Sequence, residues 1–173
     1  MTRSAVYQVG NKRNGIIYMF SIAAPNGALG GRSGADQRCV NANNLPGSNV
    51  RAFISVNSSD GIRDMPSNYG TPTDLQILSN THNKVADDWA DLMDGTIDMT
   101  LSQAGVLPSG VSWLSGSQTL VFGSMSVDHC GGWTNTFDYA GVGFSDYTNS
   151  SWMGYVNHAV CSVVVSNILC LVW

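Results

Sequence analysis

The chain has 173 residues, a formal net charge of −4 and a mean hydropathy near zero. Only two of its eight basic residues are lysines, and no run approaches the roughly 18 apolar residues of a membrane span, so nucleic-acid binding and membrane insertion are excluded as functions. All 12 acidic residues are aspartates and 19 residues are glycines, which predicts one loop-rich domain with little helix.

Residues 1–14 lack the apolar core of a signal peptide. We interpret them as an N-terminal extension or an expression-derived remnant, followed by one domain over residues 15–173. The apolar run at 15–24, closed by Pro25-Asn26-Gly27, predicts a strand and a turn.

The next segments predict a helix and a second strand. Ser33 or Asp36 is a suitable cap for a helix over about 35–43, which ends before Pro46. The alternating residues 50–56 predict a strand, and the turn-forming residues 60–80 predict a loop.

Residues 81–95 carry the best helical pattern in the chain. Val85, Trp89, Leu92 and Met93 form one apolar stripe at helical spacing, which Gly95 terminates. Short apolar runs follow it at 111–114 and 119–125, and a longer apolar run closes the chain at 161–173. The closing run fits either two strands with a tight turn or one bulged strand.

Four cysteines are present: Cys39, Cys130, Cys161 and Cys170. An even number without the CxxC spacing of a zinc site favours two disulfides and an oxidising compartment. Three pairings are possible, among them a local bridge between Cys161 and Cys170. If the bridges instead nest, their loops of 131 and 31 residues are worth at most about 5 and about 3.5 kcal/mol.

Three motifs carry a family resemblance: GGRSGADQRC at 30–39, ADDWADLMDG at 86–95 and CGGWT at 130–134. With VRAFIS at 50–55, they make residues 15–172 similar to the endostatin domain. They resemble more closely the endostatin-like family of leptospiral outer-membrane proteins.

This resemblance implies an α+β, C-type-lectin-like fold with two helices, a twisted antiparallel sheet and long loops. It also implies nested disulfides, Cys39–Cys170 and Cys130–Cys161. Asp36 is then expected to cap or bind backbone, and Trp89 to lie in the core. Endostatin's zinc site and heparin-binding arginines are not carried over, because no histidine precedes His82 and the basic residues are scattered.

The sequence offers little for catalysis or metal binding. No GxSxG motif occurs, and Ser126-Val127-Asp128-His129 is a chance neighbourhood of catalytic residue types, so we expect neither an enzyme nor a cofactor. The aspartates at 88, 91, 94 and 98 form the densest acidic cluster and leave a calcium site open as an alternative. A capped helix end is the simpler interpretation, and no metal ligand is assigned.

Residues 133–159 alternate aromatic rings with short polar side chains, a composition typical of recognition surfaces. Trp133 and Phe144 are expected to pack inward. The candidate ligand-binding residues of this segment are Asn135, Phe137, Asp138, Tyr139, Asp146, Tyr147, Asn149, Trp152, Tyr155 and Asn157.

Together with this composition, the resemblance to the endostatin-like family implies a secreted or surface-displayed bacterial binding module of the adhesin type. The resemblance also implies its partners, which would be host matrix or serum proteins such as laminin, fibronectin or complement regulators. Alternatives are a carbohydrate-binding lectin that uses calcium, a diversified receptor-binding protein, an envelope hydrolase, and a structural domain with an apolar patch at Leu171-Val172-Trp173. Alanine at Tyr139, Tyr147 or Trp152 is expected to weaken binding without changing the melting temperature.

Overall fold

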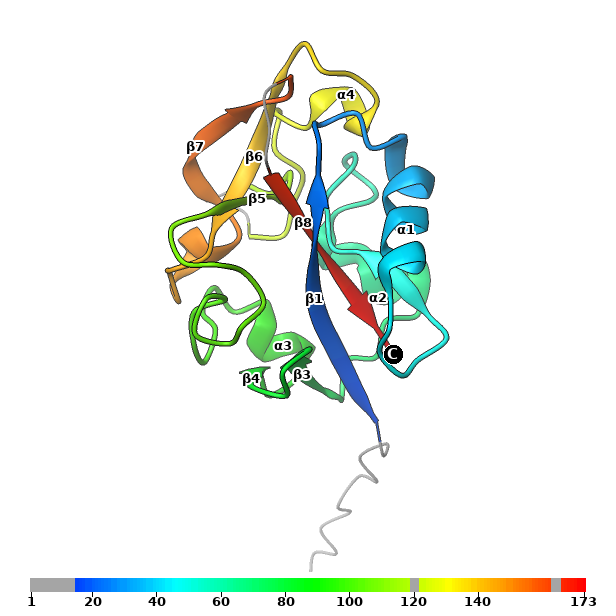
Figure 1. Cartoon of the computed structure of the whole chain (residues 1–173), viewed down its shortest axis with the longest axis vertical. Coiled ribbons are helices and arrows are strands. Elements are labelled where there is room, and N and C mark those ends of the chain that lie inside the picture. The colour runs from blue at the N-terminus through cyan, green and yellow to red at the C-terminus, as the bar shows by residue number, and fades with distance from the viewer. Residues whose placement is uncertain (1–14, 119–121, 163–165) are drawn as a thin grey trace, which may run out of the picture.

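The computed structural model describes residues 15–118, 122–162 and 166–173. Its strands are β1 (Ile16–Ala24), β2 (Val50–Ala52), β3 (Gln76–Ser79), β4 (Lys84–Ala86), β5 (Ser112–Leu114), β6 (Tyr139–Phe144), β7 (Tyr155–Val160) and β8 (Ser166–Val172). They form one curled sheet in the order β4-β3-β1-β8-β5-β6-β7, with β2 paired to β8 (Figure 1).

The helices are few and mostly short. They are α1 (Gly31–Ala42), α2 (Met65–Tyr69), α3 (Trp89–Leu92), α4 (Cys130–Trp133) and the 3-10 turns η1 (Ile62–Asp64) and η2 (Ser150–Trp152). The protein is thus α+β, as the sequence predicts. The expected two helices reduce to one long helix, α1, and several single turns.

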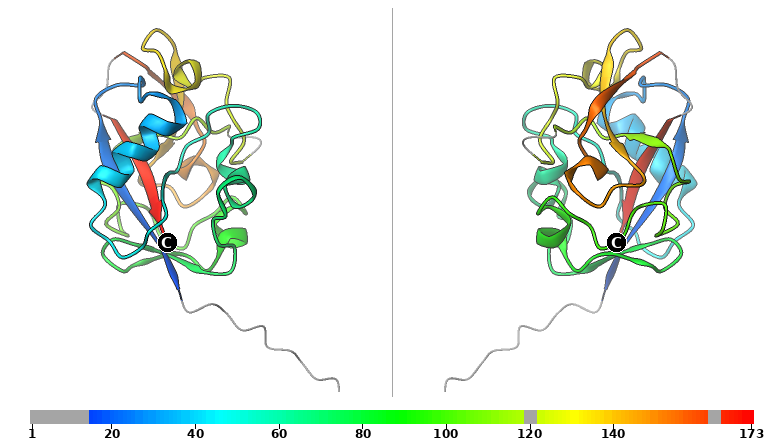
Figure 2. Two further views of the ribbon diagram at one scale, coloured as in Figure 1. Left: turned by 90° about the vertical axis from the view of Figure 1, so that its right-hand side faces the viewer. Right: turned by 90° about the vertical axis from the view of Figure 1, so that its left-hand side faces the viewer.

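The first and last strands of the domain form the centre of the sheet. β1 and β8 pair antiparallel from Tyr18↔Val172 to Ala24↔Ser166. Their side chains alternate between two buried clusters, one around Met19 and Leu171 and the other around Phe20 and Cys170. Both faces of these strands are therefore core, and Figure 2 shows α1 lying beside the pair.

Both disulfides implied by the resemblance are present. Cys39–Cys170 joins α1 to β8, and Cys130–Cys161 joins α4 to the residue that follows β7. All four cysteines are fully buried. The local Cys161–Cys170 alternative is wrong, because Cys170 points from the central strand toward α1.

The sheet is mixed, whereas we expected an antiparallel one. β1 pairs parallel with β3, and β5 pairs parallel with β8. The parallel β1–β3 pair follows from the connection between them, which crosses over through α1 and α2.

The predicted helix at 81–95 is wrong. Lys84–Ala86 is strand β4 against β3, and only Trp89–Leu92 is helical, with the Asp88 carboxylate capping the Asp91 amide at 3.0 Å. Val85, Trp89 and Leu92 are buried as the stripe requires. A strand followed by one helical turn buries the same residues, so the periodicity did not distinguish the two arrangements.

Three smaller predictions are also corrected. Residues 60–80 contain η1, α2 and β3. β3 forms because β1 supplies a pairing edge that the local sequence does not reveal. The strand expected at 50–56 ends at Ala52. The helix expected at 35–43 begins at Gly31 after Gly30, which has φ 87°, so neither Ser33 nor Asp36 is its cap.

The strand predicted at 15–24 is confirmed as β1, and the apolar run at 111–114 contains β5. Of the closing run, residues 166–172 form β8. The apolar run at 119–125 and the closing run at 161–173 fall in part on residues 119–121 and 163–165, outside the described ranges. The predicted extension at 1–14 lies outside them as well. Within the described ranges, no helix has the length and apolar character needed to cross a bilayer.

Candidate protein-binding site

Strands β6 and β7 and helix α4 form one end of the molecule (Figure 1). β6 pairs antiparallel with β7 from Tyr139↔Val160 to Val142↔Tyr155, with a register shift after Gly141. The Cys130–Cys161 disulfide ties α4 to this ribbon. Gly131 and Gly132 have φ values of 59° and 69° inside α4, a conformation that suits glycine and lets the chain turn tightly beside the disulfide.

Four large apolar side chains are exposed at this end. The exposed fraction is 95% for Phe137, 79% for Val127, 53% for Tyr139 and 44% for Val160. Tyr139 and Val160 face each other as a cross-strand pair, Phe137 precedes β6, and Val127 adjoins Asp128, whose carbonyl accepts from the Gly141 amide at 2.7 Å. We call these four residues the apolar tip.

The backbone beneath the apolar tip is fixed by hydrogen bonds. The Asn135 side chain accepts from the Phe137 amide at 3.2 Å, and the Asn135 amide donates to the Cys130 carbonyl at 3.0 Å. The Asp138 carbonyl accepts from the Cys161 amide at 2.8 Å, while the Asp138 side chain is exposed. The rings are therefore presented on a preformed loop, which lowers the entropic cost of binding.

Asp128 and His158 lie beside the apolar tip and were not predicted as a pair. The Asp128 carboxylate Oδ2 lies 2.8 Å from His158 Nδ1. Gly141 separates them in the sheet, since it pairs with His158 and its amide donates to Asp128. The two residues are 30 positions apart, so only the sheet register could have revealed the contact.

Three of the predicted rings form a second cluster. Phe144, Tyr147 and Tyr155 have ring centroids 5.5–5.6 Å apart, and Tyr147 stacks on Tyr155. A hydrogen bond between the two hydroxyls raises the pKa of Tyr147. Phe144 is only half-buried, although we expected it to pack inward, and Tyr147 is 37% exposed.

The side chains of Asp146 and Asn149 form hydrogen bonds within the protein. The Asp146 carboxylate accepts from the Ser102 and Ser109 hydroxyls and from the Gly110 amide, and the hydrogen bond from Ser102 is the main cause of its lowered pKa. The Asn149 side chain accepts from the Ser151 amide and caps η2. These two predicted ligand residues therefore stabilise loops.

Trp152 is a core residue, so its predicted role in binding is wrong. It is fully buried and stacks on Phe53 and Trp113, with ring centroids 6.1 and 6.0 Å away. Trp133 is fully buried as expected, and its indole nitrogen donates to the Ser55 carbonyl at 2.8 Å. Asn157 lies in β7, and its side chain is outside what the structure describes.

The acidic cluster differs from the predicted one. Carboxylate oxygens of Asp87, Asp91 and Asp98 lie within 4.8 Å of one another, and the Lys84 ammonium is 2.7 Å from Asp87 and 2.9 Å from Asp98. These hydrogen bonds raise the pKa of Lys84. The other two predicted members, Asp88 and Asp94, cap backbone amides instead. The lysine already supplies a cation to this cluster.

The serine–aspartate–histidine neighbourhood does not form a catalytic triad within the described residues. The Ser126 hydroxyl accepts from the Asp128 amide at 3.2 Å, and His129 Nδ1 accepts from the Gly132 amide at 2.6 Å. The Asp128 carboxylate faces His158 instead.

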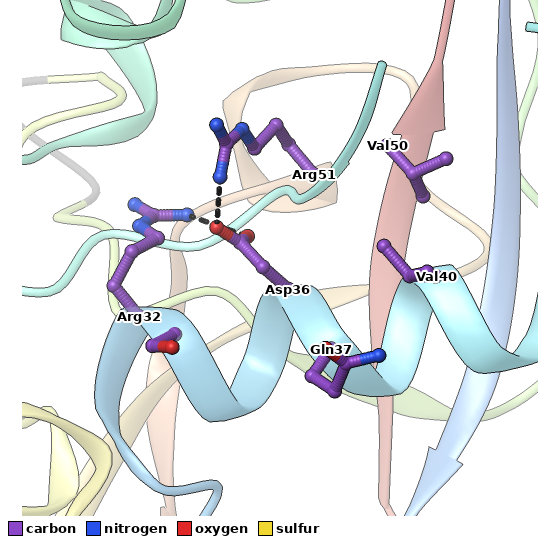
Figure 3. Close-up of a pocket in the computed structure, with 7 residues that line it drawn as sticks. Arg32, Asp36, Gln37, Val40, Val50 and Arg51 are labelled. Atoms are coloured by element: carbon purple, nitrogen blue, oxygen red, sulfur yellow. Dashed lines mark hydrogen bonds and ion pairs between the residues drawn. The ribbon is translucent and has the colours of Figure 1, made fainter. Parts of the chain in front are cut away.

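A hollow of about 400 Å³ lies between α1 and β2. Figure 3 shows Arg32 and Arg51 converging on Asp36 at its wall. The Asp36 carboxylate accepts from Arg51 Nη1 at 2.7 Å and from the Ala52 amide at 2.8 Å, which confirms its expected role as a backbone ligand. Both arginines lie over the Tyr69 ring, at 5.2 and 4.8 Å, and burial raises the pKa of Tyr69. Arg32 also pairs with Asp60 at 2.8 Å, so two arginines and two aspartates balance one another in a structural network beside this hollow.

The C-terminal residues do not form the apolar patch that would mark a structural domain. Leu171 and Val172 are fully buried in β8, and the Trp173 amide donates to the Asn49 carbonyl at 3.0 Å. Among the described residues, the two most exposed large apolar side chains, Phe137 and Val127, lie at the apolar tip instead.

Comparison with models of known protein families gives no match, and comparison with curated proteins finds none of significant similarity.

Proposed function

We propose that this chain is a non-enzymatic binding module with an endostatin-like, C-type-lectin-like fold. It acts in an oxidising environment, secreted or displayed on a bacterial surface, and binds host matrix or serum proteins. The two disulfides support the compartment, because such bonds persist where thiols are not kept reduced.

The observation that carries this proposal is the exposure of the apolar tip. A Phe side chain that is 95% exposed and a Tyr that is 53% exposed lie beside a disulfide, on backbone held by its own hydrogen bonds. Aromatic rings of this kind dominate binding energy when a partner covers them. These exposed ring surfaces add little to the stability of the isolated domain, because they remain in contact with water.

The partner is a protein for two reasons. Among the described residues, the two hollows at α1–β2 and beside Arg63 and Ser124 include no residue of the apolar tip, so neither offers it a pocket for a small ligand. Its apolar character also suits a protein surface better than a polyhydroxylated sugar. The calcium-dependent lectin alternative has the weaker support, because Lys84 occupies the acidic cluster.

The test is binding of the full chain to immobilised laminin, fibronectin and complement regulators, measured by biolayer interferometry with and without EDTA. Phe137→Ala and Tyr139→Ala are expected to weaken binding by about tenfold or more each, because each ring contributes upwards of ~1.4 kcal/mol at an interface. EDTA should have no effect.

Val40→Ala is the matched control, since Val40 on α1 is 47% exposed and lies away from the apolar tip. Equal binding by all three variants and the wild-type chain would place the binding surface elsewhere. Loss of binding in EDTA would favour the lectin alternative.

A further inference from the structure

Strand β7 is the last strand of the described sheet, and its outer edge is open. The Cys161 amide donates to the Asp138 carbonyl at 2.8 Å, so Tyr139↔Val160 is a non-hydrogen-bonded pair of the antiparallel ladder. The amide and carbonyl of Val160 therefore point away from β6, and those of His158, two residues earlier, do the same. No hydrogen bond among the described residues engages these groups. Such an edge is a template for another strand.

The side chains beside this edge define what could pair with it. Val160 and Tyr139 supply apolar surface, and the carboxylate of Asp138 is exposed next to them. The five basic residues of 15–173 lie elsewhere, in α1, β2, η1 and β4: Arg32, Arg38, Arg51, Arg63 and Lys84. The matching partner is an extended segment with alternating apolar residues and positive charge.

The chain itself contains a segment of this chemistry before β1. Ala5, Tyr7 and Val9 lie at alternate positions, with Val6 and Gln8 between them, and residues 1–14 carry three basic residues and no acidic one: Arg3, Lys12 and Arg13. With a total of −4, the remaining residues 15–173 carry −4 − 3 = −7. The segment and the domain are therefore of opposite charge.

The geometry points to a second copy as the acceptor. β1 begins at the end of the molecule opposite to α4 and the end of β7, as Figures 1 and 2 show. We propose that residues 4–9 of one copy add as a strand to the β7 edge of the next copy, with Tyr7 or Val9 against the apolar tip. Contacts of this head-to-tail kind do not close on themselves and produce linear chains of copies.

The test is sedimentation velocity of the full chain over a wide concentration range. The wild-type chain is expected to show a mass that rises with concentration through twice the 18.4 kDa monomer. Tyr7→Asp/Val9→Asp removes the donor segment, and Val160→Pro removes an outward amide without breaking a bond to β6, as proline on an edge strand permits. Each variant alone should remain monomeric.

Mixing the two variants is the decisive measurement. Val160→Pro still has a donor segment and Tyr7→Asp/Val9→Asp still has an open edge, so the mixture should give 1:1 dimers and nothing larger. Circular dichroism melting confirms that each variant is folded, and Val160→Lys replaces Val160→Pro if the proline unfolds the strand.

Three results would overturn the inference: a wild-type chain that stays monomeric, a mixture that forms no dimer, or self-association of the donor variant. The last result would assign the contact to pairing between two β7 edges. No host protein enters this experiment, and the donor variant leaves the apolar tip intact. Its outcome is therefore independent of the binding proposed above.

Discussion

The guanidinium of Arg32 donates two parallel hydrogen bonds to the carboxylate of Asp60, from Nε to Oδ2 at 3.0 Å and from Nη2 to Oδ1 at 2.8 Å. Its remaining donors reach the carbonyls of Ala52 and Ile54, both at 2.7 Å. One side chain of α1 thus supplies hydrogen-bond donors to carbonyls at the end of β2 and just after it, and to the turn that contains Asp60. This arrangement explains why the extended residues 53–56 need no partner strand on that side.

We expect Arg32→Met to destabilise the protein by roughly 3–5 kcal/mol, because a carboxylate and two carbonyls that are largely shielded from water lose their hydrogen-bond donor. The side chains of Arg32 and Asp60 are only 13% and 14% exposed. Urea denaturation measures the change. Arg38→Met on the same helix is the control and should shift the free energy of unfolding by less than about 0.5 kcal/mol. Equal values for both variants would contradict a structural role for the pair.

Trp152→Ala is expected to lower the free energy of unfolding by about 3–5 kcal/mol, because it empties a fully buried site between Phe53 and Trp113. Phe137→Ala, at a ring that is 95% exposed, should leave stability nearly unchanged. Thermal melting of the two variants checks the contrast. A large loss in Phe137→Ala would show that this ring packs in solution.

The two disulfides are expected to contribute unequally. Removing Cys39–Cys170 by paired alanine substitutions should cost more than removing Cys130–Cys161, since the loops span 131 and 31 residues. Loop entropy gives upper values of about 5 and about 3.5 kcal/mol. Guanidinium unfolding of the two double variants measures the order. The reverse order would mean that the longer loop stays compact after unfolding.

Gly27→Ala is expected to destabilise the protein by about 1–3 kcal/mol through overpacking. Gly27 is buried, its amide donates to the Cys161 carbonyl at 2.9 Å, and a Cβ there would overlap the sulfur of Cys130. Gly70→Asn is the control, because nothing surrounds that position and asparagine tolerates its φ of 68°. A stable Gly27→Ala chain with both disulfides intact, shown by non-reducing peptide mapping, would contradict this packing.

Asp146 makes stability depend on pH. Its folded pKa is lowered by the hydrogen bonds from Ser102, Ser109 and Gly110, so its contribution is complete above the unfolded value of about 3.9 and disappears as pH falls through the folded pKa. Asp146→Asn should therefore melt a few degrees below the wild-type chain at neutral pH, and the gap should close in acid. A gap that persists at the lowest accessible pH would assign the effect to the amide rather than to lost charge.

The sequence determined those parts of the fold that depend on residues close to one another along the chain. The run at 16–24 is β-favouring and pairs as β1, and the motif around Cys39 forms α1 with Asp36 bound to backbone. The pairing of Cys39 with Cys170 came from family resemblance, because cysteine spacing alone left three pairings open. The structure contains the nested pair that the resemblance implied.

Only the tertiary structure decided which aromatic rings are exposed. Trp152 and Phe137 occur in similar polar surroundings in the sequence, yet Trp152 is fully buried and Phe137 is 95% exposed. The difference arises because η2 turns Trp152 against Phe53 and Trp113, which come from distant strands and loops. The contact between Asp128 and His158 and the open edge of β7 depend in the same way on how β6 aligns with its neighbours. Such alignment is a property of long-range pairing, which no local pattern of residues contains.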